Sequence, residues 1–411
     1  MQRKLLALAV AGAFVVPGAA YAQVTISGQM RFSIDNVRWN GGAAANGAVG
    51  VSKWGLNSHS ANIKFASRES LGGGLTAWGT LENGVADGRL NAQNALWNGR
   101  NSGIGIDSTS WGTVMIGLWD SPYKQLDGAW SIGQPAAYSF GATAPILGNG
   151  DTTGSHPNPN CSVNESGAGY IIAAVPATVC SNSAGSATAF QRRLNNTFQY
   201  WSPVWNGVQL LIATQGNEEK ANGITAGQAR ADPKLWSYGL RWSGPRWALI
   251  VGHEQHKNYN LNAAQTNRSS KDTGTKFGGN YNFGPVQLGL AHERIRLELG
   301  TPAAPTDLRQ RNTSFNVAVP LGVGAFRGQV GRSRQSGSAS AADANARLFN
   351  LSYEHNMSKR TLVYIAYAKL SQGDGRAAQF GTNINGTNGR SVGNLAGQDP
   401  RFLSFGMNHT F

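Results

Sequence analysis

Two short motifs in the 411-residue chain have the residue types and spacing of reactive sites. Residues 389–393 have the sequence GRSVG, the spacing of a nucleophile elbow around Ser391. An elbow works only where a strand turns sharply into a helix, whereas this segment is rich in Gly and Asn. His253 and His256, in the run HEQH, could share a metal on a helix, but on a strand they point to opposite faces. Neither motif has the context that its chemistry requires.

Cys161 and Cys180 form a third grouping, in a polar segment rich in Gly, Ser and Asn. In an oxidising compartment such a pair predicts a disulfide, which would stabilise the segment by roughly 3 kcal/mol. No His or second Cys pair lies at ligand spacing, so we expect no metal there. With no convincing Ser/His/acid set either, the sequence predicts no enzymatic activity, no metal and no cofactor.

The first 22 residues predict the compartment. Arg3 and Lys4 precede an apolar run over residues 5–16, and a small-residue cleavage signature ends at Ala22. This pattern is typical of a secretory signal peptide, and the apolar run is too short to cross a bilayer. We therefore expect residues 1–22 to be removed and residues 23–411 to form one domain outside the cytoplasm.

Alternating residues at both ends of this domain predict strands. Apolar residues from Val24 to Ile34 alternate with polar ones, and the same pattern runs from Leu403 to the terminal Phe411. In a membrane barrel the apolar face contacts lipid and the polar face lines water. On the pair 236–243 and 247–255 the outward set is aromatic or aliphatic: Trp236, Tyr238, Leu240, Trp242, Trp247, Leu249 and Val251.

Turn signals divide the domain in a regular way. Seven tight connections are expected, at 72–74, 110–112, 205–207, 244–245, 284–285, 321–324 and 357–360. Eight long polar stretches alternate with them, at 36–58, 83–97, 120–192, 216–233, 256–271, 298–310, 335–346 and 372–399. Short turns alternating with long loops predict an all-β, sixteen-stranded antiparallel up-and-down transmembrane β-barrel. The alternative, a secreted β-sandwich, does not require the near-uniform strands of about 9–11 residues that we expect.

Strand parity predicts which charged residues face the interior. The inward basic residues are Arg31, Lys64, Arg68, Arg193, Arg241, Lys276 and Arg327. Inward acids by parity are Glu254, Glu293 and Glu354, and the loop 120–192 adds Asp120, Asp127, Asp151 and Glu165. If the interior holds water, such fixed charges set which ions enter. We take the basic set, with Asp120 and Asp127, as candidate pore-lining and constriction residues.

Six segments, in order along the chain, resemble one known family. They are FASRESLGGGL (65–75), SWGTVMIGLWDSP (110–122), RLNNTFQYWSPVWNGV (193–208), YNFGPVQLGLAH (281–292), YEHNMSKRTLVYIAY (353–367) and GMNHTF (406–411). Together they resemble the trimeric general porins of beta-proteobacteria. The resemblance implies an outer-membrane location, a homotrimer, and a third loop, here residues 120–192, folded toward the lumen.

The net charge of the chain indicates which solutes and partners to expect. After loss of the signal peptide, 33 basic residues remain against 21 acidic ones, a net charge of about +12. A secreted chain does not meet nucleic acid, so we expect lipopolysaccharide and small anions as partners. The predicted function is passive diffusion of small hydrophilic solutes with a preference for anions. The alternatives are a substrate-specific channel for organic acids and, with much less support, a barrel enzyme.

Three further arginines, Arg309, Arg311 and Arg347, fall at outward positions near the long-loop end. They fit a hydrated rim, with side chains extended toward lipid head groups, or a contact with lipopolysaccharide phosphates. The sequence favours the rim.

Overall fold

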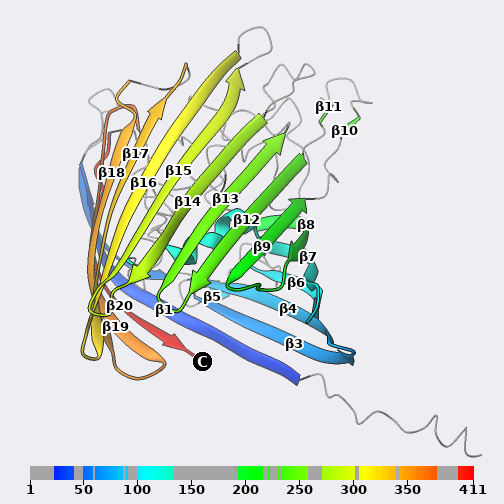
Figure 1. Cartoon of the computed structure of the whole chain (residues 1–411). Helices are drawn as coiled ribbons and strands as arrows, with labels where there is room; N and C mark the ends of the chain where they lie inside the picture. Colours follow the sequence, from blue (N-terminus) through cyan, green and yellow to red (C-terminus); the bar gives the residue numbers. More distant parts are fainter. Residues whose placement is uncertain are drawn as a thin grey trace, which may run out of the picture.

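Antiparallel strands make up nearly all the regular structure in the computed structural model of the chain (Figure 1). The structure describes residues 23–40, 50–58, 61–86, 89–90, 100–133, 190, 193–215, 221–222, 230–231, 234–257, 271–300, 305–338, 340, 342–376 and 397–411. Among the helices in these ranges, none has the length and apolar character needed to cross a membrane.

Sixteen strand positions close into a barrel. They are β1 (Gln23–Trp39), β2 (Val51–Ser58) with β3 (Asn62–Gly72), β4 (Leu75–Ala86), β6 (Ser102–Ser108), β7 (Gly112–Asp120), β8 (Arg193–Trp201), β9 (Val208–Gln215), β12 (Lys234–Gly244), β13 (Trp247–Lys257), β14 (Lys271–Asn282), β15 (Gln287–Gly300), β16 (Pro305–Leu321), β17 (Gly324–Ser336), β18 (Asn345–Asn356), β19 (Thr361–Gln372) and β20 (Arg401–Thr410). β2 and β3 pair with successive parts of β1, so together they fill one position. The predicted sixteen-stranded barrel is confirmed.

Three short strands lie outside this count. β5 (Arg89–Leu90) pairs with the end of β4, and β10 (Ala221–Asn222) pairs with β11 (Arg230–Ala231) in a separate hairpin. Closure of the barrel comes from β1 and β20, which pair from Gln29 opposite Thr410 to Arg38 opposite Arg401. A closed barrel satisfies backbone groups that would otherwise face hydrocarbon unpaired.

All seven predicted tight turns join neighbouring strands at the lower end in Figure 1, where the chain also ends. The turn between β8 and β9 shows why its residues suit it: Asn206 and Gly207 have φ angles of 47° and 84°. Asn and Gly are the residues that adopt such angles most readily. The strand ends leave residues 121–192 between β7 and β8 and residues 216–233 between β9 and β12, so the predicted loop 120–192 begins one residue early, at the last residue of β7.

The prediction of near-uniform strands is wrong. β1 and β16 each have 17 residues, whereas β6 has 7. Strands extend into the predicted loops 36–58 and 298–310, because β1–β2 and β15–β16 keep their pairing far toward the long-loop end. Hydrogen bonding between strands does not stop where lipid does, so the alternation of apolar residues marks only part of each strand.

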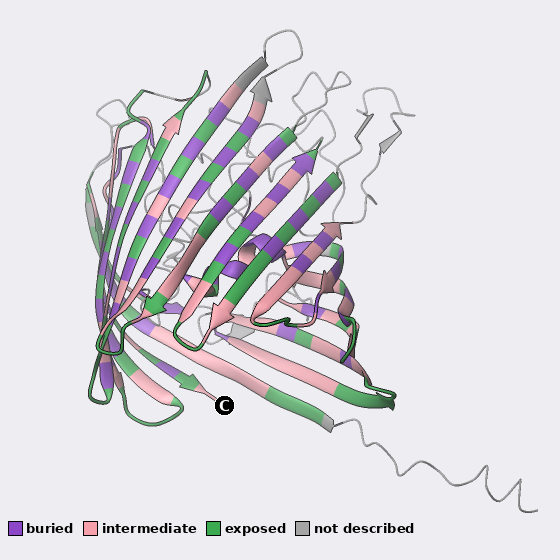
Figure 2. Cartoon of the chain, viewed as in Figure 1, coloured by how far each residue is buried: buried purple, intermediate pink, exposed green. Residues whose placement is uncertain are grey.

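Burial alternates along the strands as parity predicts, which Figure 2 shows as bands of contrasting colour. On β18 and β19 nearly every second residue is buried. The buried set on β16 is mostly polar: Gln310, Asn312, Ser314 and Asn316 face inward, together with the apolar Leu308 and Ala318. The outward face carries exposed apolar side chains, including all of the aromatic set predicted on β12. This is a barrel with a polar interior and an apolar belt.

Candidate functional site

The third loop begins with two short helices inside the barrel, α2 (Pro122–Gln125) and η2 (Leu126–Ala129). Ser121 caps α2, since its Oγ accepts a hydrogen bond from the Lys124 backbone N–H at 3.3 Å. Pro122 stands in the first turn, where its missing N–H costs nothing. The segment SPYKQ therefore turns the chain into a helix immediately after β7.

Polar contacts hold this part of the loop against the wall formed by β12, β14 and β15. The Tyr123 hydroxyl donates to Glu293 Oε1 at 2.6 Å, and its backbone N–H donates to Ser237 Oγ at 3.0 Å. Lys276 pairs with Asp127 and lies 4.1 Å from the centre of the Tyr123 ring. Ser237, Lys276 and Glu293 lie on strands distant in sequence from the loop, so only the closed barrel brings them to it.

Apolar packing fixes the loop on the same wall from both of its ends. Tyr123, from the start of the loop, and Phe190, from its return, have ring centres 5.9 Å apart, and both are fully buried. They pack in one cluster with Ile295, Leu297 and Leu308. The predicted inward fold of the third loop is thus confirmed for the described residues 121–133 and 190.

Glycines in the wall allow the loop to lie close. An added Cβ at Gly289 would be 2.3 Å from the Trp130 carbonyl oxygen, and one at Gly252 would be 3.0 Å from Leu126 Cδ1. The path continues to β17, where Arg327 Nη1 donates to the Ile132 carbonyl at 2.6 Å. The described part of the loop therefore runs along the inner wall from β12 to β17.

Burial raises the pKa of the Tyr123 phenol well above its ordinary value, and the neighbouring Glu293 carboxylate adds to the shift. Both causes disfavour the phenolate. The phenol therefore stays protonated at neutral pH and can act as the hydrogen-bond donor to Glu293.

The structure places all seven predicted basic residues on the inward side. Lys276 differs from the rest, because it is buried behind the loop with Asp127 rather than exposed to the lumen. Four others contact carboxylates or polar groups: Arg68 pairs with Asp107, Arg193 with Asp120 at 3.2 Å, Arg327 with Glu354 at 2.7 Å, and Arg241 donates to Gln209 at 2.9 Å. Arg31 and Lys64 complete the set, on β1 and β3. Glu254, Glu293 and Glu354 are inward and buried.

Among the described residues, strand parity missed three inward cations because they stand outside regular strands. Lys124 pairs with Asp120 at 2.8 Å, and Arg100 pairs with Glu82. Arg376, after β19, is buried and donates to Gln310 Oε1 at 3.2 Å. A loop residue has no period-2 signal, so nothing in the sequence alone assigns these side chains to the interior.

A group of three tryptophans also lies on the inner wall. Trp78, Trp119 and Trp201, from β4, β7 and β8, have ring centres 5.6 to 6.4 Å apart. The Trp78 indole N–H donates to Asp107 at 2.9 Å, so this tryptophan group adjoins the Arg68–Asp107 pair. Parity alone did not single it out, because tryptophans at the outer girdle are much commoner in barrels.

The structure separates the two histidines of the HEQH run as expected for a strand. His253 contacts Thr275 at 2.8 Å on the outward side, whereas His256 contacts Glu254 at 2.8 Å on the inward side. The motif at 389–393 and the residues Cys161, Cys180, Asp151 and Glu165 lie outside the described residues, as do residues 1–22, the predicted signal peptide.

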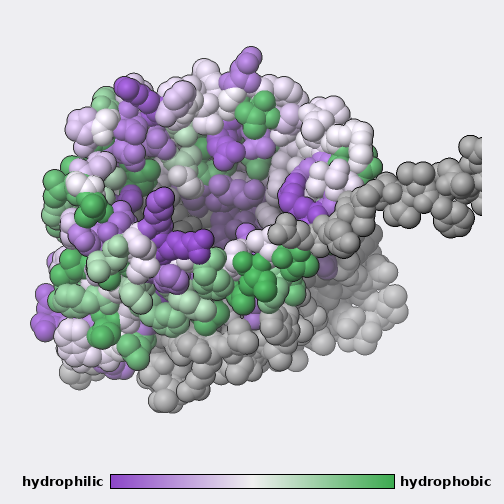
Figure 3. All heavy atoms as spheres, turned by 90° about the horizontal axis from the view of Figure 1, so that it is seen from below, coloured by the Kyte–Doolittle hydropathy of each residue, from purple (hydrophilic) through white to green (hydrophobic). Residues whose placement is uncertain are grey.

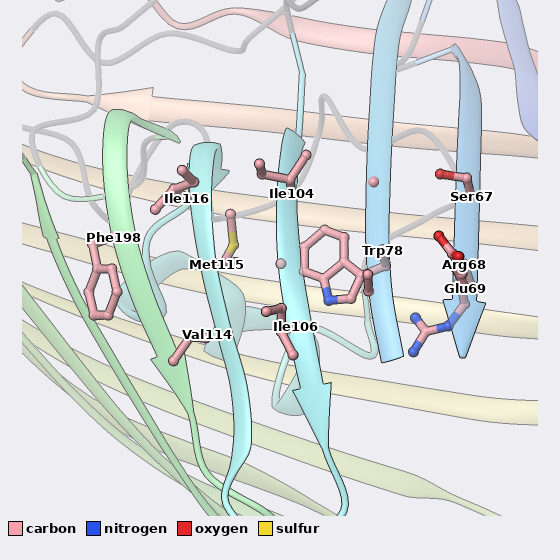
Figure 4. Close-up of a pocket in the computed structure, with 13 residues that line it drawn as sticks. Ser67, Arg68, Glu69, Trp78, Ile104, Ile106, Val114, Met115, Ile116 and Phe198 are labelled. Carbon is pink, nitrogen blue, oxygen red and sulfur yellow. The ribbon is translucent and has the colours of Figure 1, made fainter. Parts of the chain in front are cut away.

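Two surface features complete the geometry. From the short-turn end the barrel shows a recess with hydrophilic atoms in its depth (Figure 3). On the outer wall, a hollow of about 510 Å³ opens over β3, β4 and β6–β8 (Figure 4). It is lined by outward apolar side chains that include Ile104, Ile116 and Phe198, and Gly79 contributes no side chain to it.

Comparison with known proteins agrees with this architecture. The model of the Gram-negative porin family matches residues 7–375. The chain belongs to the Gram-negative porin family. Its relatives include an outer membrane porin protein of Bordetella pertussis, 26% identical over 79% of this chain and 78% of the relative. Outer membrane porin protein 32 of Delftia acidovorans is 24% identical over the whole of both chains.

Solved structures show the same fold. An anion-selective porin from Comamonas acidovorans superposes with a TM-score of 0.69 at 21% identity, covering 95% of this chain and 100% of that one. The outer-membrane protein OmpT of Vibrio cholerae, in a trimer form, gives 0.59 at 12% identity, covering 95% and 99%. Family and fold together make this protein a porin channel of the outer membrane.

Proposed function

We propose that this porin passes small hydrophilic solutes by diffusion, prefers anions, and performs no chemistry on them. The observation that carries the preference concerns the ion pairs of the inner wall. Among the residues that the structure describes, six inward pairs link a Lys or Arg to a carboxylate; in three of them the cation is clearly more exposed than the acid, and in the two pairs of Asp120 the exposures are nearly equal. For Arg68 and Asp107 the exposed fractions are 62% and 30%, and for Arg327 and Glu354 they are 30% and 9%.

Each such pair has no net charge, but its cation lies nearer to the lumen than its carboxylate does. An ion in the water-filled pore approaches the guanidinium more closely than the carboxylate behind it, so the near field attracts anions. Lys64 and Arg241 reinforce this bias, since neither forms an ion pair with any residue that the structure describes. The exception among the six pairs, Lys276–Asp127, is buried and supports the loop instead.

The test is the reversal potential across a planar bilayer in a KCl gradient. An anion-preferring pore gives the sign expected for chloride permeation. A reversal potential of the opposite sign, or none, would contradict the proposal. The permeabilities of chloride and of small carboxylates are then compared in the same bilayer by replacing the salt.

A second candidate, a channel with some selectivity for organic acids, is favoured by the tryptophan group beside Arg68. An aromatic surface next to a guanidinium suits an anion that carries an apolar or aromatic part. Benzoate should then block chloride current at lower concentration than acetate does, and Trp119→Ala should reduce that difference. Equal block by the two carboxylates would leave only the general pore.

We also propose a homotrimer. The hollow on the outer wall between β3 and β8 is apolar, and side chains of a second copy would fill it (Figure 4). The trimer form of the Vibrio cholerae neighbour supports this proposal. Analytical ultracentrifugation of the detergent-solubilised porin should give the mass of three chains, and Ile104→Arg should shift it toward one. A wild-type protein that sediments as one chain would refute it.

A further inference from the structure

Seven arginines occupy outward positions on four adjacent strands, β15 to β18, in the half nearest the long loops. This arginine patch consists of Arg294, Arg296, Arg309, Arg311, Arg332, Arg334 and Arg347, all of them exposed. Three were visible as a possible rim from parity alone. The structure adds the other four and brings all seven into one surface.

Strand register places these arginines directly opposite one another. Arg311 of β16 lies opposite Arg294 of β15 and opposite Arg334 of β17. Two further pairs flank this row: Arg296 with Arg309, and Arg332 with Arg347. Residues opposite each other in antiparallel strands have Cβ atoms about 5 Å apart, so like charges there repel.

Counter-charges in the protein are few. The Arg309 Nε donates to Asp307 at 2.6 Å, at the upper edge of the patch, where Glu298 stands opposite Asp307. Among the described residues, the other six arginines have no ion pair or side-chain hydrogen bond. The inner face of the same strands is different, because its charged groups are partnered. The described residues therefore leave most of the positive charge of the patch unbalanced.

The position of the patch along the barrel wall indicates which anionic groups could neutralise its positive charge. Phe349 and Val330 are exposed and apolar, and each lies two residues below an arginine, Arg347 and Arg332. Two residues along a strand span about 7 Å. The guanidiniums therefore begin where the lipid-facing apolar belt ends, at the level of lipid phosphates rather than in free solvent.

We propose that the arginine patch binds the phosphate groups of an outer-leaflet glycolipid, the lipid anchor of lipopolysaccharide. A guanidinium binds phosphate oxygens with two parallel hydrogen bonds, and opposed arginines on neighbouring strands can share one phosphate. The ligand converts the repulsion within each pair into joint attraction. This partner lies on the outer wall, and its binding is independent of the ion preference of the pore.

The test uses Arg311→Gln/Arg332→Gln/Arg334→Gln in the full mature porin. The matched control, Arg246→Gln/Lys359→Gln/Arg360→Gln, removes the same charge from exposed residues at the short-turn end. Each detergent-solubilised protein is titrated with purified bisphosphorylated lipid A, and bound lipid is counted by native mass spectrometry. We expect binding about tenfold weaker for the patch variant and within about twofold of wild type for the control.

Two further ligands distinguish the phosphate source. Lipid A without phosphates should bind weakly to the wild type, and millimolar inorganic phosphate should not displace bisphosphorylated lipid A. Unchanged binding by the patch variant, equal loss in the control, or strong binding of the dephosphorylated lipid would each overturn the proposal, as would displacement by inorganic phosphate.

Folding of the variant is checked independently of lipid. In a bilayer of neutral lipids the patch variant should keep wild-type single-channel conductance, since none of its three changes faces the lumen. If the triple variant fails to insert, Arg311→Gln alone tests the same idea, because Arg311 faces an arginine on each side. It should weaken lipid A binding about threefold, and unchanged binding would again overturn the proposal.

Discussion

The inner and outer faces of β15–β18 carry charge in opposite ways, although they alternate residue by residue on the same strands. Inside, Glu293 accepts hydrogen bonds from Tyr123 and Asn312, and Glu354 pairs with Arg327. Outside, Asp307 is the one carboxylate in the described part of the chain that forms an ion pair with the arginine patch. The difference teaches that the net charge of the chain does not measure the charge of its pore. Part of the positive excess faces lipid.

The largest effect should come from breaking the buried pair that holds the loop. Lys276→Met leaves Asp127 buried without its cation, which costs about 3–5 kcal/mol when one partner of a buried pair is removed. The loop should detach from the β14 wall and widen the pore, so single-channel conductance should rise. Lys271→Met, an exposed lysine on the same strand, is the control and should leave conductance unchanged. Equal conductance in both variants would show that the pair does not position the loop.

A smaller loss is expected from Tyr123→Phe. This change removes the hydrogen bond to Glu293 while it preserves the packing against Phe190, so the free energy of unfolding should fall by about 1.5–3 kcal/mol. Chemical denaturation in detergent measures it. Tyr238→Phe, on the outward face, should have a much smaller effect.

The pH dependence of the wild type follows from the same group. The pKa of Tyr123 is raised in the folded state, so an unfolded tyrosine ionises first as pH increases. The contribution of this hydroxyl to stability is therefore complete below the ordinary tyrosine pKa of about 10 and declines above it. In Tyr123→Phe this decline should be smaller, which a comparison of the two denaturation profiles from pH 7 to about 11 would reveal.

Ion selectivity should depend on cations of the inner face and not on those of the outer face. Lys64→Gln/Arg241→Gln removes two inward cations and should lower the chloride-to-potassium permeability ratio about twofold. Arg311→Gln/Arg334→Gln removes two outward cations and should leave the ratio unchanged. Reversal potentials in a KCl gradient measure both. A similar drop in the two variants would mean that the outer face also contributes to selectivity.

The smallest effect concerns repulsion within the arginine patch. In detergent free of phosphorylated lipid, Arg334→Gln removes one like-charge contact with Arg311 and should raise the melting temperature by about 1 °C. Added bisphosphorylated lipid A should reverse the order, since the wild type then gains the ligand. A melting temperature that is lower in the variant without lipid would contradict the repulsion.

Much of the barrel could be predicted from local pattern. The seven turns, the inward side of the seven basic residues and the ends of loop 120–192 all follow from signals within a few residues of the site concerned. The strand lengths could not, because pairing between β1 and β2 or β15 and β16 depends on two segments meeting, not on the alternation of either one.

In the candidate site, too, the sequence predicts the side of a residue but not its contacts. Parity assigned Lys276 to the interior, but only its neighbours show that it is buried against Asp127 and the Tyr123 ring. Arg100 and Arg376 carry no periodic signal, since they stand in loops, and their carboxylate or amide partners come from other strands.

The sequence by itself determined the alternation of faces, the number of strands and the places where the chain turns, because side-chain direction in a strand has a period of two and turn chemistry is local. The tertiary structure decided which charges meet. On the inner face, barrel closure and strand register placed carboxylates beside the cations, and on the outer face they placed arginines beside other arginines. These contacts join residues from different strands, and no local pattern encodes which residues pair.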